Sequence, residues 1–193
     1  RMSNKKVPML NRHIRALSER LVQGEPLTHN MLSWAKQHVE WSLAEGDYTA
    51  RDGVLMLVID IDGNAAMTVG EYEPLADTSA KALRARSAEA RSEADETGVA
   101  PELLAAVNNG ELAFVAPADE CLCGTATLIE QLAQTKGIPV TRVDIPAQLK
   151  GALFLVSDEH GVVPATETDA AEADAATVAF FADGYEKLRA RRS

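Results

Sequence analysis

The chain has 193 residues, of which 46% are hydrophobic and 25% are charged, so it offers enough apolar chain for one sizeable core or for two small lobes. Its formal net charge is -10, and such a chain repels nucleic-acid phosphates and anionic membrane surfaces, so neither is an expected partner. No apolar run approaches the roughly 20 residues of a membrane helix. The two cysteines, Cys121 and Cys123, are too close together for a good disulfide, and they fit a reducing, cytoplasmic location.

Two helices are predicted at the start of the chain. Apolar residues recur at helical spacing over residues 10–22, and Gly24 ends that helix. Either Thr28 or Asn30 caps a second helix, whose apolar face repeats every three to four residues until Gly46 ends it.

A β-hairpin is predicted next. The near-continuous apolar run over residues 54–61 predicts a strand that is buried on both faces, and the turn residues 62–64 lead into a second strand over residues 65–69. The strand ends in an Asp-x-Asp-Gly sequence that begins at Asp60. This sequence resembles the opening motif of haloacid-dehalogenase-type phosphotransferases, in which the first Asp is a nucleophile and the second, here Asp62, is a general acid beside Mg²⁺. A strand followed by an Asp-Gly turn explains the same residues, and a Mg²⁺-dependent phosphatase stays an alternative.

Residues 74–78 are typical of a linker, which divides the chain into a small α+β lobe over residues 1–74 and a larger mixed α/β lobe over residues 75–193. The fold class that follows is α+β. In the larger lobe the pattern predicts a helix from the Ser79 cap to Thr97 and a hairpin over residues 103–115 with Asn108-Asn109-Gly110 between its strands. A helix over residues 125–136 and strands over residues 138–143 and 152–156 follow. A terminal helix has Val178, Phe181, Tyr185 and Leu188 on its apolar stripe.

Gly124 and Thr125 stand at the start of the second helix predicted in the larger lobe. Free backbone N–H groups and the positive end of the helix dipole make such a start a common anion cradle. Ser157, Asp158 and His160 crowd one turn further on. A catalytic triad converges from separate elements, so this cluster does not predict hydrolysis. No metal site is predicted either, because the C-x-C pair with one distant His lacks the four ligands of a structural zinc site.

Taken in order, these features resemble the class IV aminotransferase family, the fold-type IV enzymes that use pyridoxal phosphate (PLP), which includes branched-chain aminotransferases, D-amino-acid aminotransferases and aminodeoxychorismate lyase. The segment LNRHIRAL (residues 10–17) is similar to a family segment that ends in His-x-x-Arg-Leu. Residues 110–140 are similar to the family pattern G-x-L-x-T-P … L-x-G-I-T-R … L-A … G-I-x-V. Residues 154–164, FLVSDEHGVVP, are similar to F-L-T-x-T-A-x-G-V-x-P.

The resemblance implies a reduced D-amino-acid-aminotransferase-like fold and a homodimer. Lys81 stands where the Schiff-base lysine of the family opens the large domain, and it is the implied catalytic residue. The implied cofactor-binding residues are Gly124, Thr125, Ser157 and Asp158.

Several cofactor positions depart from the family pattern. The opening strands with the Gly-Asp-Gly-x-F-E region are absent, and the segment 124–127 lacks the Thr and Arg of Gly-Ile-Thr-Arg. Asp158 stands where a Thr or Ser hydroxyl would bind the cofactor phosphate, and a carboxylate repels a dianion. The hairpin that carries the Glu facing the pyridine nitrogen is shortened between Leu104 and Glu111.

We therefore expect a divergent relative that has lost PLP. It would bind or act on a small amino or oxo acid without the cofactor, or serve as a non-catalytic dimeric homologue. A genuine PLP-dependent aminotransferase or lyase with Lys81 as the Schiff-base lysine is the alternative.

Overall fold

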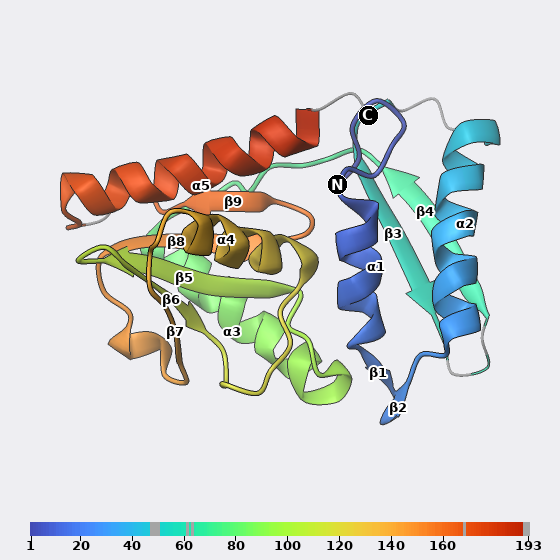
Figure 1. Ribbon diagram of the computed structural model, residues 1–193, viewed down its shortest axis with the longest axis horizontal. Helices are drawn as coiled ribbons and strands as arrows, with labels where there is room; N and C mark the ends of the chain where they lie inside the picture. Colours follow the sequence, from blue (N-terminus) through green and yellow to red (C-terminus); the bar gives the residue numbers. More distant parts are fainter. Residues whose placement is uncertain (47–50, 61, 63, 168, 191–193) are drawn as a thin grey trace.

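The computed structural model describes residues 1–46, 51–60, 62, 64–167 and 169–190 (Figure 1). The helices are α1 (Leu10–Ser18), α2 (His29–Glu45), α3 (Ala80–Thr97), α4 (Gly124–Thr135) and α5 (Glu172–Ala190), with a short 3-10 turn, η1 (Pro146–Gln148). The strands are β1 (Leu21–Val22), β2 (Glu25–Pro26), β3 (Val54–Ile59), β4 (Ala65–Gly70), β5 (Glu102–Asn108), β6 (Glu111–Val115), β7 (Val140–Val143), β8 (Ala152–Ser157) and β9 (Gly161–Pro164). This mixture of helices with a mixed sheet confirms the predicted α+β class.

A five-stranded sheet in the order β7-β6-β5-β8-β9 forms the larger part of the molecule, and only the β6–β7 pair is parallel. The two central strands, β5 and β8, alternate their side chains between two buried faces. On one face, Leu103 and Phe154 share a core cluster with side chains of α4 and α5. On the other face, Leu104 and Leu155 pack with Leu83 of α3. The sheet is therefore the middle layer of three, as Figure 1 shows.

The hairpin β3–β4 forms a separate two-stranded sheet, with Leu57 opposite Met67. One face of this hairpin packs against α2, where Met2, Val39 and Leu43 form a small core cluster. α2 begins at Thr28, whose side-chain oxygen accepts a hydrogen bond from the N–H of Met31, so the first of the two predicted caps is the one used.

The second face of β3 is open, which corrects the prediction of a strand buried on both faces. Met56 and Val58 are each 55% exposed. The apolar run is long enough for a buried central strand, but β3 has only β4 as a neighbour in its sheet and a helix on only one side. Residue 61, the last of the predicted strand, lies outside the described residues.

The first predicted helix is also shorter than expected. α1 ends at Ser18, and Leu21 and Val22 lie in β1, which pairs with β2. Gln23 and Gly24 close this small hairpin with φ angles of 50° and 82°. Successive positive φ angles belong to a two-residue hairpin turn, so the chain cannot continue the helix through Val22.

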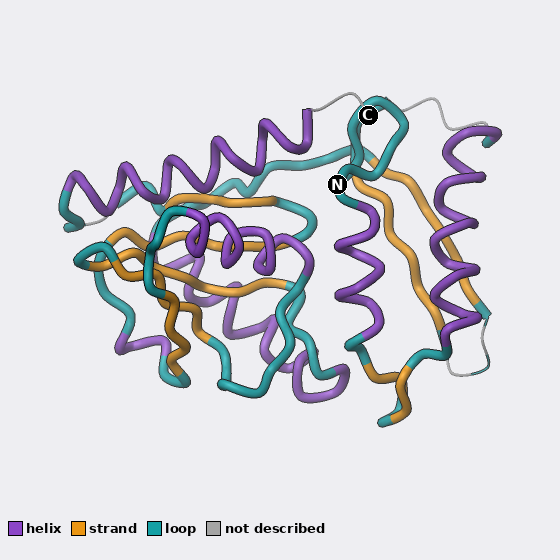
Figure 2. Tube along the Cα trace, in the orientation of Figure 1, coloured by secondary structure: helices purple, strands orange, loops and turns teal. Residues whose placement is uncertain are grey.

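α1 joins the two parts of the molecule, because it packs against both α2 and α4. Figure 2 shows it between the β3–β4 hairpin and the helix α4. The proposed lobe boundary at residue 74 falls in the irregular segment between β4 and α3. Among the described residues, no helix combines the length and apolar character needed to cross a membrane.

Candidate functional site

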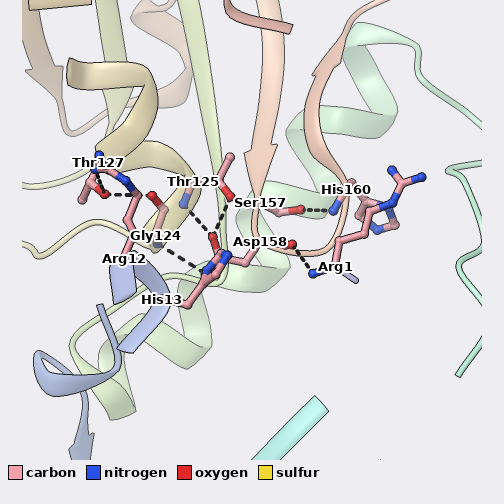
Figure 3. A network of polar contacts seen from close by, with 9 residues as sticks. All are labelled: Arg1, Arg12, His13, Gly124, Thr125, Thr127, Ser157, Asp158 and His160. Atoms are coloured by element: carbon pink, nitrogen blue, oxygen red, sulfur yellow. Dashed lines mark hydrogen bonds and ion pairs between the residues drawn. The ribbon is translucent and has the colours of Figure 1, made fainter. Parts of the chain in front are cut away.

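The N-terminus of α4 holds an internal carboxylate. Asp158, directly after β8, accepts hydrogen bonds from the backbone N–H of Gly124 (3.3 Å), the backbone N–H of Thr125 (2.6 Å) and the Thr125 hydroxyl (2.7 Å) (Figure 3). Cys123, which precedes the helix, makes no side-chain cap. The orphan N–H groups of the first turn are therefore satisfied by a side chain from another element, and its negative charge lies at the positive end of the helix dipole.

The local structure around Asp158 is closely packed. The hydroxyl of Ser157 is buried and accepts a hydrogen bond of 2.8 Å from the backbone N–H of His160, which fixes the turn between β8 and β9. Gly124 has no room for a side chain, because a Cβ atom there would lie 2.7 Å from Nδ1 of His13. Glycine at this position lets the helix start approach both His13 and Asp158.

His13 completes the polar cluster from α1. Its Nδ1 lies 3.2 Å from Oδ2 of Asp158. Partial burial alone would raise the pKa of Asp158, but the hydrogen bond and charge of His13 and the hydrogen bonds from Thr125 outweigh it, so the pKa lies well below its ordinary value. The neighbouring Arg12 donates to the Thr127 hydroxyl at 3.0 Å and also to the side chain of Gln131. Two consecutive residues of α1 thus tie that helix to α4.

A cleft of about 670 Å³ opens beside this cluster, between α1, β3 and the end of β8. Leu10, Ile14 and Leu17 of α1 contribute apolar side chains, and all six residues of β3 line the cleft. His13, Ser157 and Asp158 also line it. The cleft therefore combines apolar walls with polar groups, which include this cluster and the Arg20–Glu93 ion pair. Such a combination is the usual make-up of a small-molecule site.

His160, at the same turn, belongs to a buried polar group behind the cleft. Its Nε2 lies 3.1 Å from a guanidinium nitrogen of Arg86, and its Nδ1 lies 3.4 Å from the Tyr72 hydroxyl. Burial lowers its pKa, so the ring stays neutral near pH 7. This arrangement supports the turn that carries Ser157 and Asp158.

The structure brings together four of the five residues proposed for the site. Gly124, Thr125, Ser157 and Asp158 meet at the start of α4 and beside the cleft. Lys81 does not join them: it is exposed in the first turn of α3, and it lines neither this cleft nor the smaller cavity beside α3.

The carboxylate of Asp60 has a structural role in the turn after β3. It accepts hydrogen bonds from the backbone N–H of Asp62 (3.0 Å) and from the backbone N–H (2.8 Å) and side-chain amide (2.9 Å) of Asn64. The bond from the Asn64 side chain is the main reason that the pKa of Asp60 is lowered. Residues 61 and 63 of the Asp-x-Asp-Gly motif lie outside the described residues. Among those described, no three His, Cys, Asp or Glu side chains gather as a metal ion would require.

His13 and Arg12 are the site residues that the sequence alone did not identify. Histidines of the first two helices are by default packing or solvent-facing residues, and the LNRHIRAL segment departs from His-x-x-Arg-Leu by one position. The available signal was that His13 falls between Leu10 and Leu17, on the face of α1 that turns toward the cleft.

The position that the family resemblance assigns to the cofactor phosphate is thus filled by Asp158. The resemblance assigns Gly124 and Thr125 to binding of the cofactor, and the N–H groups of both already donate to this carboxylate. The residues present do not fit PLP, because its phosphate dianion would have to displace an anionic side chain from its hydrogen bonds.

No family model and no curated protein sequence matches the chain. Solved structures do match. A hypothetical aminotransferase from Mycobacterium tuberculosis, in its PLP-bound form, has a TM-score of 0.61 and 11% identity, with 95% of this chain and 86% of that chain covered. A fold IV transaminase from Curtobacterium pusillum has a TM-score of 0.60 and 16% identity, with 99% and 84% covered. The 4-amino-4-deoxychorismate lyase from Pseudomonas aeruginosa has a TM-score of 0.55 and 14% identity, with 94% and 87% covered. At these identities the likeness establishes the architecture, and the chain has the fold of the fold-type IV aminotransferases and aminodeoxychorismate lyases.

Proposed function

We propose that this protein is a divergent, class IV aminotransferase-like protein that works without PLP and binds a small amino or oxo acid in the cleft between α1 and β3. The observation that carries the proposal is the carboxylate of Asp158 at the start of α4, where it takes three hydrogen bonds from Gly124 and Thr125. The protein's own anion occupies the cradle that the fold offers to an anionic cofactor group.

Electrostatics support the loss of PLP. Two like unit charges about 4 Å apart repel by roughly 4 kcal/mol at the effective dielectric of a protein surface, and a phosphate dianion carries more than one charge. Moving Asp158 aside would also break its hydrogen bonds to Thr125 and its ion pair with His13. Lys81 supports the same conclusion, because its side chain does not line the cleft.

The size and the lining of the cleft support the binding of a ligand. Its volume of about 670 Å³ lies within the range of small-molecule sites. The apolar side chains of α1 and β3 suit a ligand with an apolar side chain, and His13 offers a polar contact for a carboxylate. A homodimer belongs to the proposal through the family resemblance, and a solution mass measurement tests it.

The first test is the absorption spectrum of the purified protein in the near-ultraviolet and visible range, before and after PLP is added. We expect no Schiff-base band and no borohydride-reducible adduct on Lys81. Lys81→Ala and Lys150→Ala are the matched variants, because both remove an exposed lysine and Lys150 lies outside the predicted site. A band that disappears in Lys81→Ala but persists in Lys150→Ala would instead establish the PLP-dependent alternative.

The ligand is tested by calorimetry with a series of amino and oxo acids whose apolar side chains grow in length. We expect binding to strengthen with side-chain length because the walls of the cleft are apolar. Ile14→Arg, which puts a charged side chain into the wall, is expected to abolish the heat of binding while the far-ultraviolet circular dichroism stays that of the parent. Heats of dilution alone for every acid would contradict this part of the proposal.

A further inference from the structure

The cleft runs along a free sheet edge. β3 pairs with β4 on one edge only. All six residues of β3 line the cleft, whereas none of the residues of the fully described β4 does. The cleft therefore lies along the edge of β3 that faces away from β4.

The backbone of this edge can be assigned from the register. The N–H of Asp60 donates to the carbonyl of Asn64, so these two residues form a hydrogen-bonded pair. Hydrogen-bonded pairs alternate along an antiparallel ladder, so Leu55, Leu57 and Ile59 point their N–H and C=O groups away from β4. None of these outward groups has a backbone or side-chain hydrogen-bond partner among the described residues.

The protein already uses the start of the same edge for strand pairing. The N–H of Met2 donates to the carbonyl of Gly53 at 2.7 Å, and the N–H of Lys5 donates to the carbonyl of Arg51, also at 2.7 Å. Gly53 precedes β3 and has the same parity as Leu55. The edge thus accepts a partner up to Gly53 and then continues unpaired along the cleft.

We infer that the free edge of β3 binds an extended, peptide-like ligand, which adds a strand at Leu55, Leu57 and Ile59. Three residues that present both N–H and C=O groups are matched by a chain of amides, which a free amino acid does not have. The distance from Leu55 to Ile59 is about 13 Å at roughly 3.3 Å per residue, so a peptide of about five residues spans it. Alternate side chains of the ligand would point toward the apolar residues of α1.

Charge favours a basic peptide as the occupant. The chain carries a net charge of -10. Four carboxylates line the cleft together with Arg1, Arg20 and His13. Glu93, Glu102 and Asp158 are ion-paired with Arg20, Arg86 and His13, whereas the side chain of Glu159 is 47% exposed and can meet a positive group of the ligand. A peptide with lysine at its ends is attracted to a chain of this net charge. The inference uses the ligand cleft of the proposed function, and it does not depend on the loss of PLP.

The test uses a capped pentapeptide of sequence lysine-valine-threonine-valine-lysine and amide hydrogen exchange measured by NMR. In the free protein the amides of Leu55, Leu57 and Ile59 should exchange faster than those of Met56 and Val58, which pair with β4. Saturating peptide should slow exchange at the first three by about tenfold or more and leave the other two unchanged.

Two controls isolate backbone pairing. N-methylation of alternate amides in the peptide, in the two possible sets, should weaken binding about tenfold or more for one set and little for the other, because only one set faces β3. Leu57→Pro removes an outward N–H without touching the β3–β4 ladder, and Leu57→Ala shortens the same side chain but keeps that N–H. We expect only the proline variant to lose the peptide, and the N-methylated peptides decide the matter if that variant does not fold.

Four outcomes would overturn the inference. One is unchanged exchange at Leu55, Leu57 and Ile59 under saturating peptide, and another is equal binding of both N-methylated sets. A third is protection of these amides without peptide together with a doubled solution mass, which would assign the edge to a second copy. Calorimetric binding of free amino or oxo acids without binding of the peptide would refute this inference and leave the proposed function standing. A Schiff-base band with PLP would refute the loss of the cofactor and leave the peptide result intact.

Discussion

The most informative perturbation is Asp158→Ala, which removes the anion from the start of α4. The substitution leaves the N–H groups of Gly124 and Thr125 and the Thr125 hydroxyl without their acceptor, and it leaves His13 without its ion-pair partner. The change is confined to the site, since Asp158 follows β8 and takes no part in the ladder.

The expected cost combines three effects. Loss of a capping side chain costs about 0.5–2 kcal/mol, and loss of a negative charge from a helix N-terminus costs about 0.3–1 kcal/mol. The ion pair with His13 adds roughly 0–1 kcal/mol, because the Asp158 side chain is 38% exposed and solvent screens the pair. Together these effects predict a loss of about 2–3 kcal/mol, or roughly 5–10 °C in melting temperature for a chain of this size.

The pH dependence gives a sharper signature. The pKa of Asp158 in the folded state lies below its ordinary value of 3.8, so its contribution is fully present above that value and is lost as the pH falls through the folded-state pKa. Urea unfolding followed by circular dichroism should therefore show the full gap between the parent and Asp158→Ala at pH 7 and a narrowing gap below pH 3.8.

Asp158→Asn is the matched control, because it keeps an oxygen acceptor for Thr125 but removes the charge. We expect it to lose about half as much stability as Asp158→Ala, with little of the parent's pH dependence. The reasoning is refuted if Asp158→Ala lies within about 0.5 kcal/mol of the parent at pH 7, or if the gap stays constant as the pH falls.

Three further predictions concern neighbouring contacts. His13→Gln should raise the pKa of Asp158 toward its ordinary value, because His13 is the partner that lowers this pKa most. A carboxyl ¹³C NMR titration measures the pKa, and an unchanged midpoint would contradict the assignment. Asp174→Ala should lower the free energy of unfolding in urea by about 2–3 kcal/mol, because this residue is 5% exposed and its carboxylate accepts two hydrogen bonds of 2.9 Å from the N–H groups of the β5–β6 turn. A loss below about 0.5 kcal/mol would count against that role. Ser87→Ala should cost about 1–3 kcal/mol and speed hydrogen exchange at Leu104, whose buried N–H donates to the Ser87 hydroxyl; unaltered exchange would show that this N–H finds another acceptor.

Elements set by local turn chemistry were predictable from the sequence. Asn109 and Gly110 both have positive φ angles, and they close the β5–β6 hairpin with Asn108 opposite Glu111, as the Asn-Gly signal predicts. The Ser79 cap likewise opens α3 through a hydrogen bond from the N–H of Ala82. In both cases the deciding contacts lie within a few residues of the signal.

The environment of β3 could not be predicted in the same way. Its apolar run is the same whether the strand has neighbours on both sides or on one. The exposure of Met56 and Val58 follows from the absence of a further layer or strand among the described residues, and the sequence of β3 does not record that. The free edge of β3, which we propose as a binding site, has the same origin, because β4 is the only strand beside β3 in its sheet among the described residues.

The candidate site was predictable only in part, for a similar reason. The residues around Gly124 and Thr125 predict the start of a helix, but the carboxylate that accepts the hydrogen bonds of its first turn belongs to Asp158, 34 residues away from Gly124. The sequence placed Asp158 at the phosphate position through the order of family motifs, not through geometry. His13 reaches the cluster from α1, and no local pattern pairs that helix with α4.

The most direct test of the account is whether the start of α4 accepts an external anion. The measurement is an NMR titration of the parent protein and of Asp158→Ser with inorganic phosphate and then with PLP, following the amide signals of Gly124 and Thr125. The account predicts that these signals stay in place in the parent and shift, with saturation, in Asp158→Ser, where the carboxylate no longer accepts their hydrogen bonds. Saturable shifts of both amides in the parent would contradict it, because they would show that the cradle is open to phosphate while Asp158 is present.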